Sequence, residues 1–420
     1  MTAPDRFERQ LPELMTDLAP ARVPDYFDDL LRATARTRQR PAWSSLERWL
    51  PMDLALPSAP GRARPLAGLA LLGLVALLVI AALLAFVGSR PPRVPPPFGP
   101  AANGAMYYTS ATGDILSMDP LNGASTAVLA GLKADGVLPS RDGLRIAVTG
   151  KVIGGEQLSV ADADGKHSHA LPGTYANFSE IDWSPNDVQV AIVSEVAGVP
   201  SITILEADGS KATALKVGLE VHNFWYLPDG RLAFHGTSIT GPKTYGLYVV
   251  DPNGAAAPRS IVPPSTVDNW LGMSPSQDGT RVVYHKWVDD PIEHGRIHVI
   301  DVASGTDTTV LVTGTVPAEE FEDATFSPDG QSILFKRFTP DDNVRLAVVP
   351  AAGGAPISIG PAVHFDVSPN ALYSPDGRSV IAWYPSLHQL WLLDPTGNAA
   401  ADRQLTAPVT DVPTWQRLAP

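Results

Sequence analysis

A strand-and-turn unit that recurs seven times restricts the fold of this chain more than any other feature of its sequence. In each copy a short apolar strand ends at a marker residue, usually an acid, and a glycine turn follows, as in QLSVADADG (157–165) and GLYVVDPNG (246–254). Such periods are typical of architectures in which each unit buries its apolar face against the next one. The markers lie 43 to 50 residues apart and are Asp119, Asp162, Glu206, Asp251, Asp301, Pro350 and Asp394.

A second unit lies between successive copies of the first. It is a tight turn after a proline, followed by a β-rich run, as in FSPDGQSILF (326–335) and YSPDGRSVIAW (373–383). Proline presets φ at the start of such a turn and glycine accepts a positive φ, so Pro-Asp-Gly predicts a turn on physical grounds. One copy departs from the pattern, because Asn186-Asp187 replaces Asp-Gly.

The two units are unequal in number, and the difference predicts how the fold closes. There are six of the proline turns and seven of the marker strands, because the first repeat lacks its opening strand. The C-terminal segment VPTWQRLA (412–419) supplies a matching strand without its turn. Three N-terminal strands and one C-terminal strand would close a ring, as in β-propellers. We therefore predict an all-β fold over residues 104–420, a seven-bladed (alternatively six-bladed) β-propeller of four-stranded antiparallel blades.

The repeat resembles that of a known family. The S-P-D-G turns, followed by x-I-x-F/V and then by L-x-V-x-D-x-x-G, resemble the TolB-type, WD-like propeller repeat over roughly residues 104–419. The resemblance implies four-stranded blades around a central channel. Asn186-Asp187 and Pro350 depart from the repeat, and we expect them to weaken individual turns without changing the fold.

A strongly apolar segment precedes the repeats. Residues 66–87, LAGLALLGLVALLVIAALLAFV, contain no charged side chain over 22 positions. A helix of that length measures about 33 Å, which matches a hydrocarbon core of about 30 Å. The 65 residues before it are too many for the charged region of a cleavable signal peptide. The segment is therefore predicted to be a single transmembrane helix that acts as an uncleaved signal-anchor.

The flanking arginines predict the orientation of this helix. Arg62 and Arg64 lie directly before it with eight further arginines upstream, whereas only Arg90 and Arg93 follow it before Lys133. The positive-inside rule then places residues 1–65 in the cytoplasm and the propeller outside the cytoplasm, at the cell membrane. Residues 88–103 are rich in proline and are predicted to form an extended stalk.

The cytoplasmic tail, residues 1–65, is predicted to form short helices broken by proline. One helix begins after Pro24 with acids in its first turns and ends in arginines, which complements the helix dipole. The tail as a whole is either loosely ordered or a segment that docks on a cytoplasmic protein. The layout of tail, anchor and outer domain resembles membrane-bound anti-sigma factors, although the tail has neither Cys nor His. The candidate docking face is Tyr26, Phe27, Leu30 and Leu31.

Composition excludes several classes of function. The chain has no cysteine, which excludes disulfides, thiolate catalysis and cysteine-ligated metals. Its formal net charge of −13 argues against binding to nucleic acid, since phosphate contacts require a basic surface. G-x-S-x-G, H-E-x-x-H and P-loop patterns are absent from the sequence. We therefore predict no catalytic, cofactor-binding or metal-binding residues, and expect that the protein is not an enzyme.

Acidic residues gather in three loops of the fifth and sixth repeats. These loops are the longer connections of the predicted blades, so they share the propeller face opposite the short glycine turns. They are interpreted either as a solvated acidic rim or as a surface that binds a divalent cation or a basic partner. The residues are Asp289, Asp290, Glu293, Glu319, Glu320, Glu322, Asp323, Asp341 and Asp342.

Three hypotheses for function remain at the level of the sequence. The first is a membrane-anchored interaction module whose outer propeller binds a protein, a peptide or an envelope polymer. The second adds signalling, with the tail docked on a cytoplasmic regulator. The third is an enzyme with its site in the propeller channel, which is the least favoured because a fold alone does not select an activity.

Overall fold

The computed structural model describes residues 73–78, 94–176, 179–254, 256–266, 271–290, 292–312 and 319–420. The chain divides into two units, Met1–Arg90 and Pro91–Pro420. In the first unit, residues 73–78 are helical. Within the described ranges, no helix has both the length and the apolar character needed to cross a bilayer. The rest of the predicted anchor and the predicted docking face of Tyr26, Phe27, Leu30 and Leu31 lie outside these ranges.

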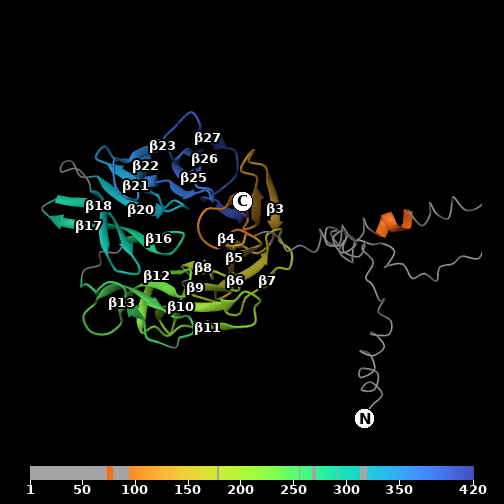
Figure 1. The fold of residues 1–420 in the computed structure, drawn as a ribbon, viewed down its shortest axis with the longest axis horizontal. Helices are drawn as coiled ribbons and strands as arrows, with labels where there is room; N and C mark the ends of the chain where they lie inside the picture. Colours follow the sequence, from red (N-terminus) through yellow and green to blue (C-terminus); the bar gives the residue numbers. More distant parts are fainter. Residues whose placement is uncertain are drawn as a thin grey trace, which may run out of the picture. The chain divides into compact units, whose positions relative to one another are not determined.

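The second unit is a ring of four-stranded antiparallel sheets (Figure 1). We number these blades 1 to 7 and name their strands A to D from the innermost strand outward. Blade 1 contains β28 (Thr414–Leu418), β1 (Ala102–Thr109), β2 (Ile115–Met118) and β3 (Ser125–Leu129). Blade 2 contains β4 (Ala134–Pro139), β5 (Arg145–Val152), β6 (Gly155–Asp162) and β7 (His169–Ala170). Blade 3 contains β8 (Ile181–Trp183), β9 (Gln189–Val196), β10 (Val199–Glu206) and β11 (Ala212–Ala214).

The remaining blades follow the same order. Blade 4 contains β12 (Leu219–Tyr226), β13 (Leu232–Ser238), β14 (Tyr245–Val250) and β15 (Arg259–Ser260). Blade 5 contains β16 (Leu271–Pro275), β17 (Arg281–Asp290), β18 (Ile292–Asp301) and β19 (Asp307–Val312). Blade 6 contains β20 (Glu320–Phe326), β21 (Ser332–Thr339), β22 (Asn343–Pro350) and β23 (Ile357–His364). Blade 7 contains β24 (Asn370–Tyr373), β25 (Val380–Tyr384), β26 (Gln389–Leu393) and β27 (Arg403–Leu405). Two short 3-10 helices, η3 (Phe365–Val367) and η4 (Pro385–Leu387), lie in connections of blades 6 and 7.

The prediction of a seven-bladed propeller is confirmed, because the described residues form seven sheets of four strands each. Every marker residue ends a strand C or directly follows one, as Asp162 does for β6 and Asp251 for β14. Each proline turn connects a strand A to a strand B, as Ser327–Gln331 connects β20 to β21. The A–B and C–D turns therefore share one face, which we call the short-turn face. The B–C and D–A connections share the other face, which we call the loop face.

The predicted closure of the ring is also confirmed. The C-terminal β28 pairs with β1, with Met106 opposite Trp415 and Tyr107 opposite Thr414. The strand β1 begins at Ala102, two residues before the predicted boundary. The closing strand also lies against the next blade, where Gly143 has a φ of +72° and a Cβ atom would meet the Arg417 carbonyl at 1.9 Å. Only glycine fits at position 143 for both reasons.

Apolar side chains between neighbouring blades form the core. Trp183 of blade 3 packs with Ala147 and Leu158 of blade 2 in one buried cluster. Trp383 of blade 7 and Trp415 of blade 1 share another cluster. These tryptophans therefore pack between neighbouring blades. Because each blade covers the face of the next, the ring must be complete to bury all of them.

The last part of the predicted stalk differs from the expected extended chain. Residues 97–99 form a bend, and Pro95 is buried. The guanidinium group of Arg417 donates hydrogen bonds of 2.7 Å to the carbonyl oxygens of both Pro97 and Gly99. The Phe98 ring centre lies 4.5 Å from Cζ of Arg141. The segment bends because Arg417 binds its carbonyl oxygens and Arg141 lies over its phenyl ring. These two arginines of the propeller hold the segment against the short-turn face.

Removal of Thr410–Pro420 should destabilise the propeller strongly. The truncation deletes β28, exposes the edge of β1 and removes Trp415, and loss of one such buried tryptophan costs about 3–5 kcal/mol. We expect the melting temperature of the full chain in detergent to fall by several degrees, or the protein to aggregate. Deletion of Ala419 and Pro420 alone is the control, since both lie after β28. Equal melting temperatures for the two deletions would exclude β28 as the closing strand.

Candidate functional site

The candidate site is the axial channel that the innermost strands surround. Three cavities of about 260, 440 and 390 Å³ lie along it. The first shares Thr325 and Leu372 with the second, and Leu138 and Thr414 with the third, so the three belong to one channel. The first opens among the proline turns, at the short-turn face. The other two open at the loop face, where the A strands begin.

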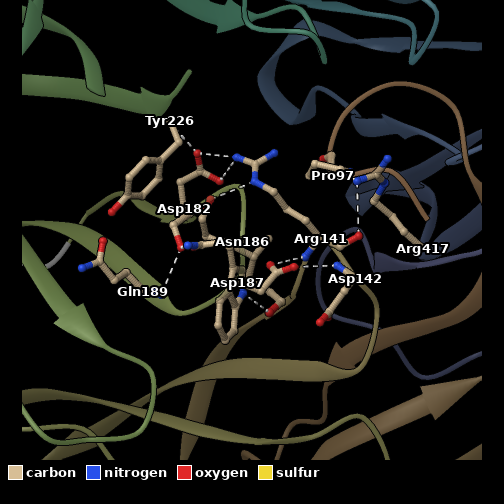
Figure 2. Close-up of polar contacts among 12 residues, drawn as sticks. Pro97, Arg141, Asp142, Asp182, Asn186, Asp187, Gln189, Tyr226 and Arg417 are labelled. Carbon is tan, nitrogen blue, oxygen red and sulfur yellow. Dashed lines mark hydrogen bonds and ion pairs between the residues drawn. The ribbon is translucent and has the colours of Figure 1, made fainter. Parts of the chain in front are cut away.

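A partly buried ion pair organises the short-turn mouth of the channel (Figure 2). Nη2 of Arg141 lies 2.7 Å from each carboxylate oxygen of Asp182, and its Nε donates to the Trp183 carbonyl oxygen at 2.8 Å. Asp182 also accepts a hydrogen bond of 2.9 Å from the backbone N–H of Tyr226. The pair thus connects the A–B turn of blade 2 with the A strands of blades 3 and 4.

The surroundings of Asp182 act on its charge in opposite directions. Burial raises the pKa of the Asp182 carboxyl above its ordinary value, whereas the Arg141 charge and the backbone N–H groups of Tyr226 and Trp183 lower it. A carboxylate in such a place is stable only while its cationic partner remains. The pair is therefore a structural element of the mouth, and its charges already satisfy each other.

The departure of Asn186-Asp187 from the repeat has a consequence that the sequence did not reveal. Asp187 adopts a φ of +55°, the conformation that glycine takes in the other turns. Its two carboxylate oxygens accept hydrogen bonds from the backbone N–H groups of Arg141 and Asp142, at 2.7 and 2.9 Å (Figure 2). We expected this substitution to weaken the turn, but it connects blades 2 and 3 instead. Burial raises the pKa of Asp187 from 3.8 to about 6.

Arg417 completes the short-turn mouth. Besides the carbonyls of Pro97 and Gly99, it contacts the Arg141 carbonyl oxygen at 3.3 Å. Among the described residues, no carboxylate lies within ion-pair distance of this guanidinium group. Burial and the nearby Arg141 charge lower the pKa of Arg417 to about 10. The mouth is therefore lined, around the cavity of about 260 Å³, by chain segments that bind one another.

The loop-face mouth is polar, and its central group is a buried lysine. Nζ of Lys336 lies 2.6 Å from the Asp323 carboxylate, 3.3 Å from Ser368 Oγ and 3.4 Å from Asn370 Oδ1. Asn370 in turn donates to Asp411 at 3.1 Å. Asp323 sits at a β-bulge with a φ of +50°, where the register between β20 and β21 shifts. The sequence suggested Asp323 as a surface residue but did not indicate Lys336.

The structure separates the predicted acidic surface into individual roles. Glu319 accepts hydrogen bonds from Nε and Nη2 of Arg337 in an ion pair, and Asp341 accepts hydrogen bonds from Thr339 and Asn343 within its own turn. The described residues contain no group of three His, Cys, Asp or Glu side chains that could hold a metal ion. The backbone of the β17–β18 hairpin carries three of the other residues, Asp289, Asp290 and Glu293. Glu320 is exposed and Glu322 is half-buried, and Asp342 adopts a left-handed conformation in a turn.

Exposed aliphatic side chains mark the loop face of three successive blades. Ile153 is fully exposed at the β5–β6 hairpin, next to Val152. Val196 and Ile239 are exposed at the equivalent hairpins of blades 3 and 4. The signal was present in the sequence, since each of these residues lies one or two positions before a glycine in a B–C connection. Exposed aliphatic side chains also occur at the short turns, as Leu121 and Val188 do, so what distinguishes the loop face is their recurrence at equivalent B–C hairpins of three neighbouring blades.

Blade 5 holds a polar cluster that motif searching missed. Tyr284 Oη donates to Asp307 at 2.7 Å, and His298 Nδ1 lies 3.0 Å from the other oxygen of the same carboxylate. Tyr284 and His298 are nearly completely buried. The three residues come from strands B, C and D of one blade, so only the folded sheet brings them together. The carboxylate orients both side chains, and their burial makes the cluster a structural one.

Comparison with known proteins shows the fold alone. No protein-family model and no curated protein matches the sequence. The β-propeller domain of the trilobed protease from Pyrococcus furiosus is 13% identical, with a TM-score of 0.53 over 73% of this chain and 94% of that one. An oligogalacturonate lyase in complex with manganese is 13% identical, with a TM-score of 0.51 over 73% and 85% of the two chains. TolB from Acinetobacter baumannii is 16% identical, with a TM-score of 0.43 over 62% and 63%. The match therefore spans less than two thirds of TolB.

These similarities confirm a propeller and leave its activity as a prediction. The P. furiosus domain is described as having an open velcro topology, whereas here β28 pairs with β1. One of the similar structures is a lyase, so the fold does not decide between binding and catalysis. That the present chain is not an enzyme stays a prediction.

Loss of the Asp182 carboxylate should destabilise the propeller by about 3–5 kcal/mol, because Asp182→Asn leaves the Arg141 charge without its partner. The matched control is Asp229→Asn, whose ion pair with Arg231 is about half exposed on both sides. That change should cost less than about 1 kcal/mol. Denaturant unfolding of the full chain measures both. Similar losses for the two variants would show that the partly buried pair does not hold the blades together.

Asp187 should make stability fall as the pH rises from about 4 to about 7. The pKa of Asp187 is about 6 in the folded state and 3.8 ordinarily. The stability that this carboxyl contributes is therefore complete below pH 3.8 and is lost as the pH rises through about 6. Relative to Asp187→Asn, the wild type should lose roughly 2–3 kcal/mol over this range. Asparagine also accepts the left-handed conformation.

The control for this pH dependence is Asp208→Asn. Asp208 is exposed, and hydrogen bonds from Ser210 hold its pKa below the ordinary value, so it is already ionised across the range. Its variant should follow the wild-type profile in denaturant unfolding at each pH. A parallel profile for Asp187→Asn would contradict the assignment.

Proposed function

We propose that the protein is a membrane-anchored binding module that offers the loop face of its propeller to a ligand outside the cytoplasm. The observation that carries this proposal is the chain segment held at the short-turn mouth. The segment before β1 and the end of β28 reach that face, where Arg417 and Arg141 hold Pro97, Phe98 and Gly99 beside the entrance to the channel. Among the described residues, the segment that enters the propeller contacts the short-turn face and not the loop face.

The apolar segment of residues 66–87 supports the anchoring part of the proposal, and the arginines before it support a cytoplasmic N-terminus. Seven residues separate Val87 from Pro95, the first buried residue of the described segment that enters the propeller. Eight Cα–Cα steps span at most about 29 Å. In this proposal the short-turn face therefore stays near the bilayer, and the loop face points away from it.

Two features of the loop face support binding as its role. Three neighbouring blades present exposed aliphatic side chains there, at Ile153, Val196 and Ile239. The channel opens on the same face, and cavities of about 440 and 390 Å³ are within the size range of ligand pockets. A contact surface and a pocket thus lie side by side around one mouth.

The absence of cysteine allows a sharp test. Ile153→Cys on the loop face and Ser210→Cys on the short-turn face each create a unique thiol in the full chain. In intact cells, an impermeant maleimide should label both of these and spare Ala35→Cys in the tail until the cells are permeabilised. Labelling of position 35 in intact cells would overturn the orientation.

The same variants test the binding face. A photoactivatable benzophenone maleimide attached to the Ile153→Cys variant should give discrete cross-linked adducts in living cells, whereas the matched probe on the Ser210→Cys variant should give none. Adducts of equal yield from both positions, or from position 210 alone, would contradict the assignment of the loop face.

A further inference from the structure

The largest of the three channel cavities contains a cation at a place where burial is costly. Lys336 is 7% exposed and lines the cavity of about 440 Å³ at the loop-face mouth. Removing an ammonium group from water is unfavourable unless several acceptors replace its hydration. Its charged partner among the described residues is Asp323, whose side chain is 58% exposed. Asp323 therefore remains largely in contact with water, whereas Lys336 is nearly buried.

The hydrogen bonds of Lys336 leave room for a better acceptor. An ammonium group has three donors, and only the contact with Asp323, at 2.6 Å, is short. The contacts with Ser368 and Asn370, at 3.3 and 3.4 Å, exceed the usual range of about 2.7–3.2 Å. An oxyanion in the cavity could accept hydrogen bonds from these two N–H groups of Lys336 at normal distances.

A second polar group near the cavity lacks a partner. Nδ1 of His285 is buried and has no hydrogen bond among the described residues. The ring lies against Gly272, which lines the cavity, and a Cβ atom there would come within 2.7 Å of Nδ1. His285 itself is not among the residues that line the cavity, so this nitrogen lies beside the site without facing a ligand there.

Acceptors surround the same lysine. Asp323 lines the cavity, and Asp411 lies beside it through Asn370. An anionic ligand bound to Lys336 would lie next to these carboxylates. The site therefore favours an anion that also carries a hydrogen-bond donor for them to accept. The apolar remainder of the lining includes Met273, Leu372 and Val412. The cavity thus combines one cation, adjacent acceptors and an apolar wall.

We propose that this cavity binds a small carboxylate that carries a hydroxyl or ammonium group on the carbon next to the carboxyl. Lys336 pairs with the ligand carboxylate, and Asp323 accepts a hydrogen bond from the neighbouring donor. The apolar wall contacts the rest of the ligand. This inference rests on the proposed function, since it identifies a ligand class for the loop-face mouth.

Three probes with the same carbon skeleton test the chemistry. Propionate, lactate and alanine differ only in the group on the second carbon, which is hydrogen, hydroxyl or ammonium. Added at millimolar concentration to the full chain in detergent, lactate or alanine should raise the melting temperature more than propionate does, and lactamide should have no effect. Sodium chloride at equal ionic strength is the control. No shift with lactate or alanine up to about 50 mM, or an equal shift with propionate, would overturn the proposal.

Matched variants locate the site. Lys336→Met keeps an unbranched side chain of similar length and should weaken lactate binding at least tenfold. Lys243→Met is the control, because Lys243 is exposed on the same face but outside the cavity lining. Asp323→Gly keeps the cation, accepts the positive φ of +50° and removes the acceptor, so it should abolish the preference for lactate over propionate, which a purely structural ion pair would not affect. Unchanged binding in Lys336→Met, or an unchanged preference in Asp323→Gly, would overturn the proposal.

The outcome is separable from that of the cross-linking test. Adducts from the probe at position 153 without carboxylate binding would keep the binding module and reject this cavity as its ligand site. Carboxylate binding without adducts from position 153 would keep the cavity and reject the loop face as a contact surface for macromolecules.

Discussion

The pairing of β28 with β1 joins parts of the chain that lie more than 300 residues apart, and the rest of the propeller depends on it. Each blade buries one face against the next, so an open ring would leave two blade faces in water. Trp415 on β28 packs with Trp383 of blade 7 and Met106 of blade 1. One strand thus completes a sheet and, through this cluster, the packing between the last blade and the first.

The charged side chains at the two mouths of the channel differ in how completely their partners satisfy them. At the short-turn mouth, Arg141 is matched by Asp182, and both are further satisfied by backbone groups of neighbouring blades. At the loop-face mouth, Lys336 has one close carboxylate and two long contacts. The first arrangement is complete without a ligand and holds blades together. The second has unused hydrogen-bonding capacity beside a cavity, which is the condition for a binding site.

The fold was predictable from the sequence because its signals are local. A turn such as Ser327–Gln331 depends on proline, aspartate and glycine at fixed spacing, so its position can be recognised without the structure. The contacts at the mouths depend on distant residues: Arg141 and Asp182 are 41 positions apart. The bulge that brings Asp323 to Lys336 contains no glycine to mark it, since Asp323 itself takes the positive φ. The candidate site therefore required the three-dimensional arrangement.

The contacts of Arg417 have a mechanical consequence. Through the carbonyls of Pro97 and Gly99, this side chain fastens the segment that enters the propeller to the strand that ends it. A pull on the entering segment is therefore transmitted to β28 as well as to β1, and the two paired strands at the seam of the ring carry it together.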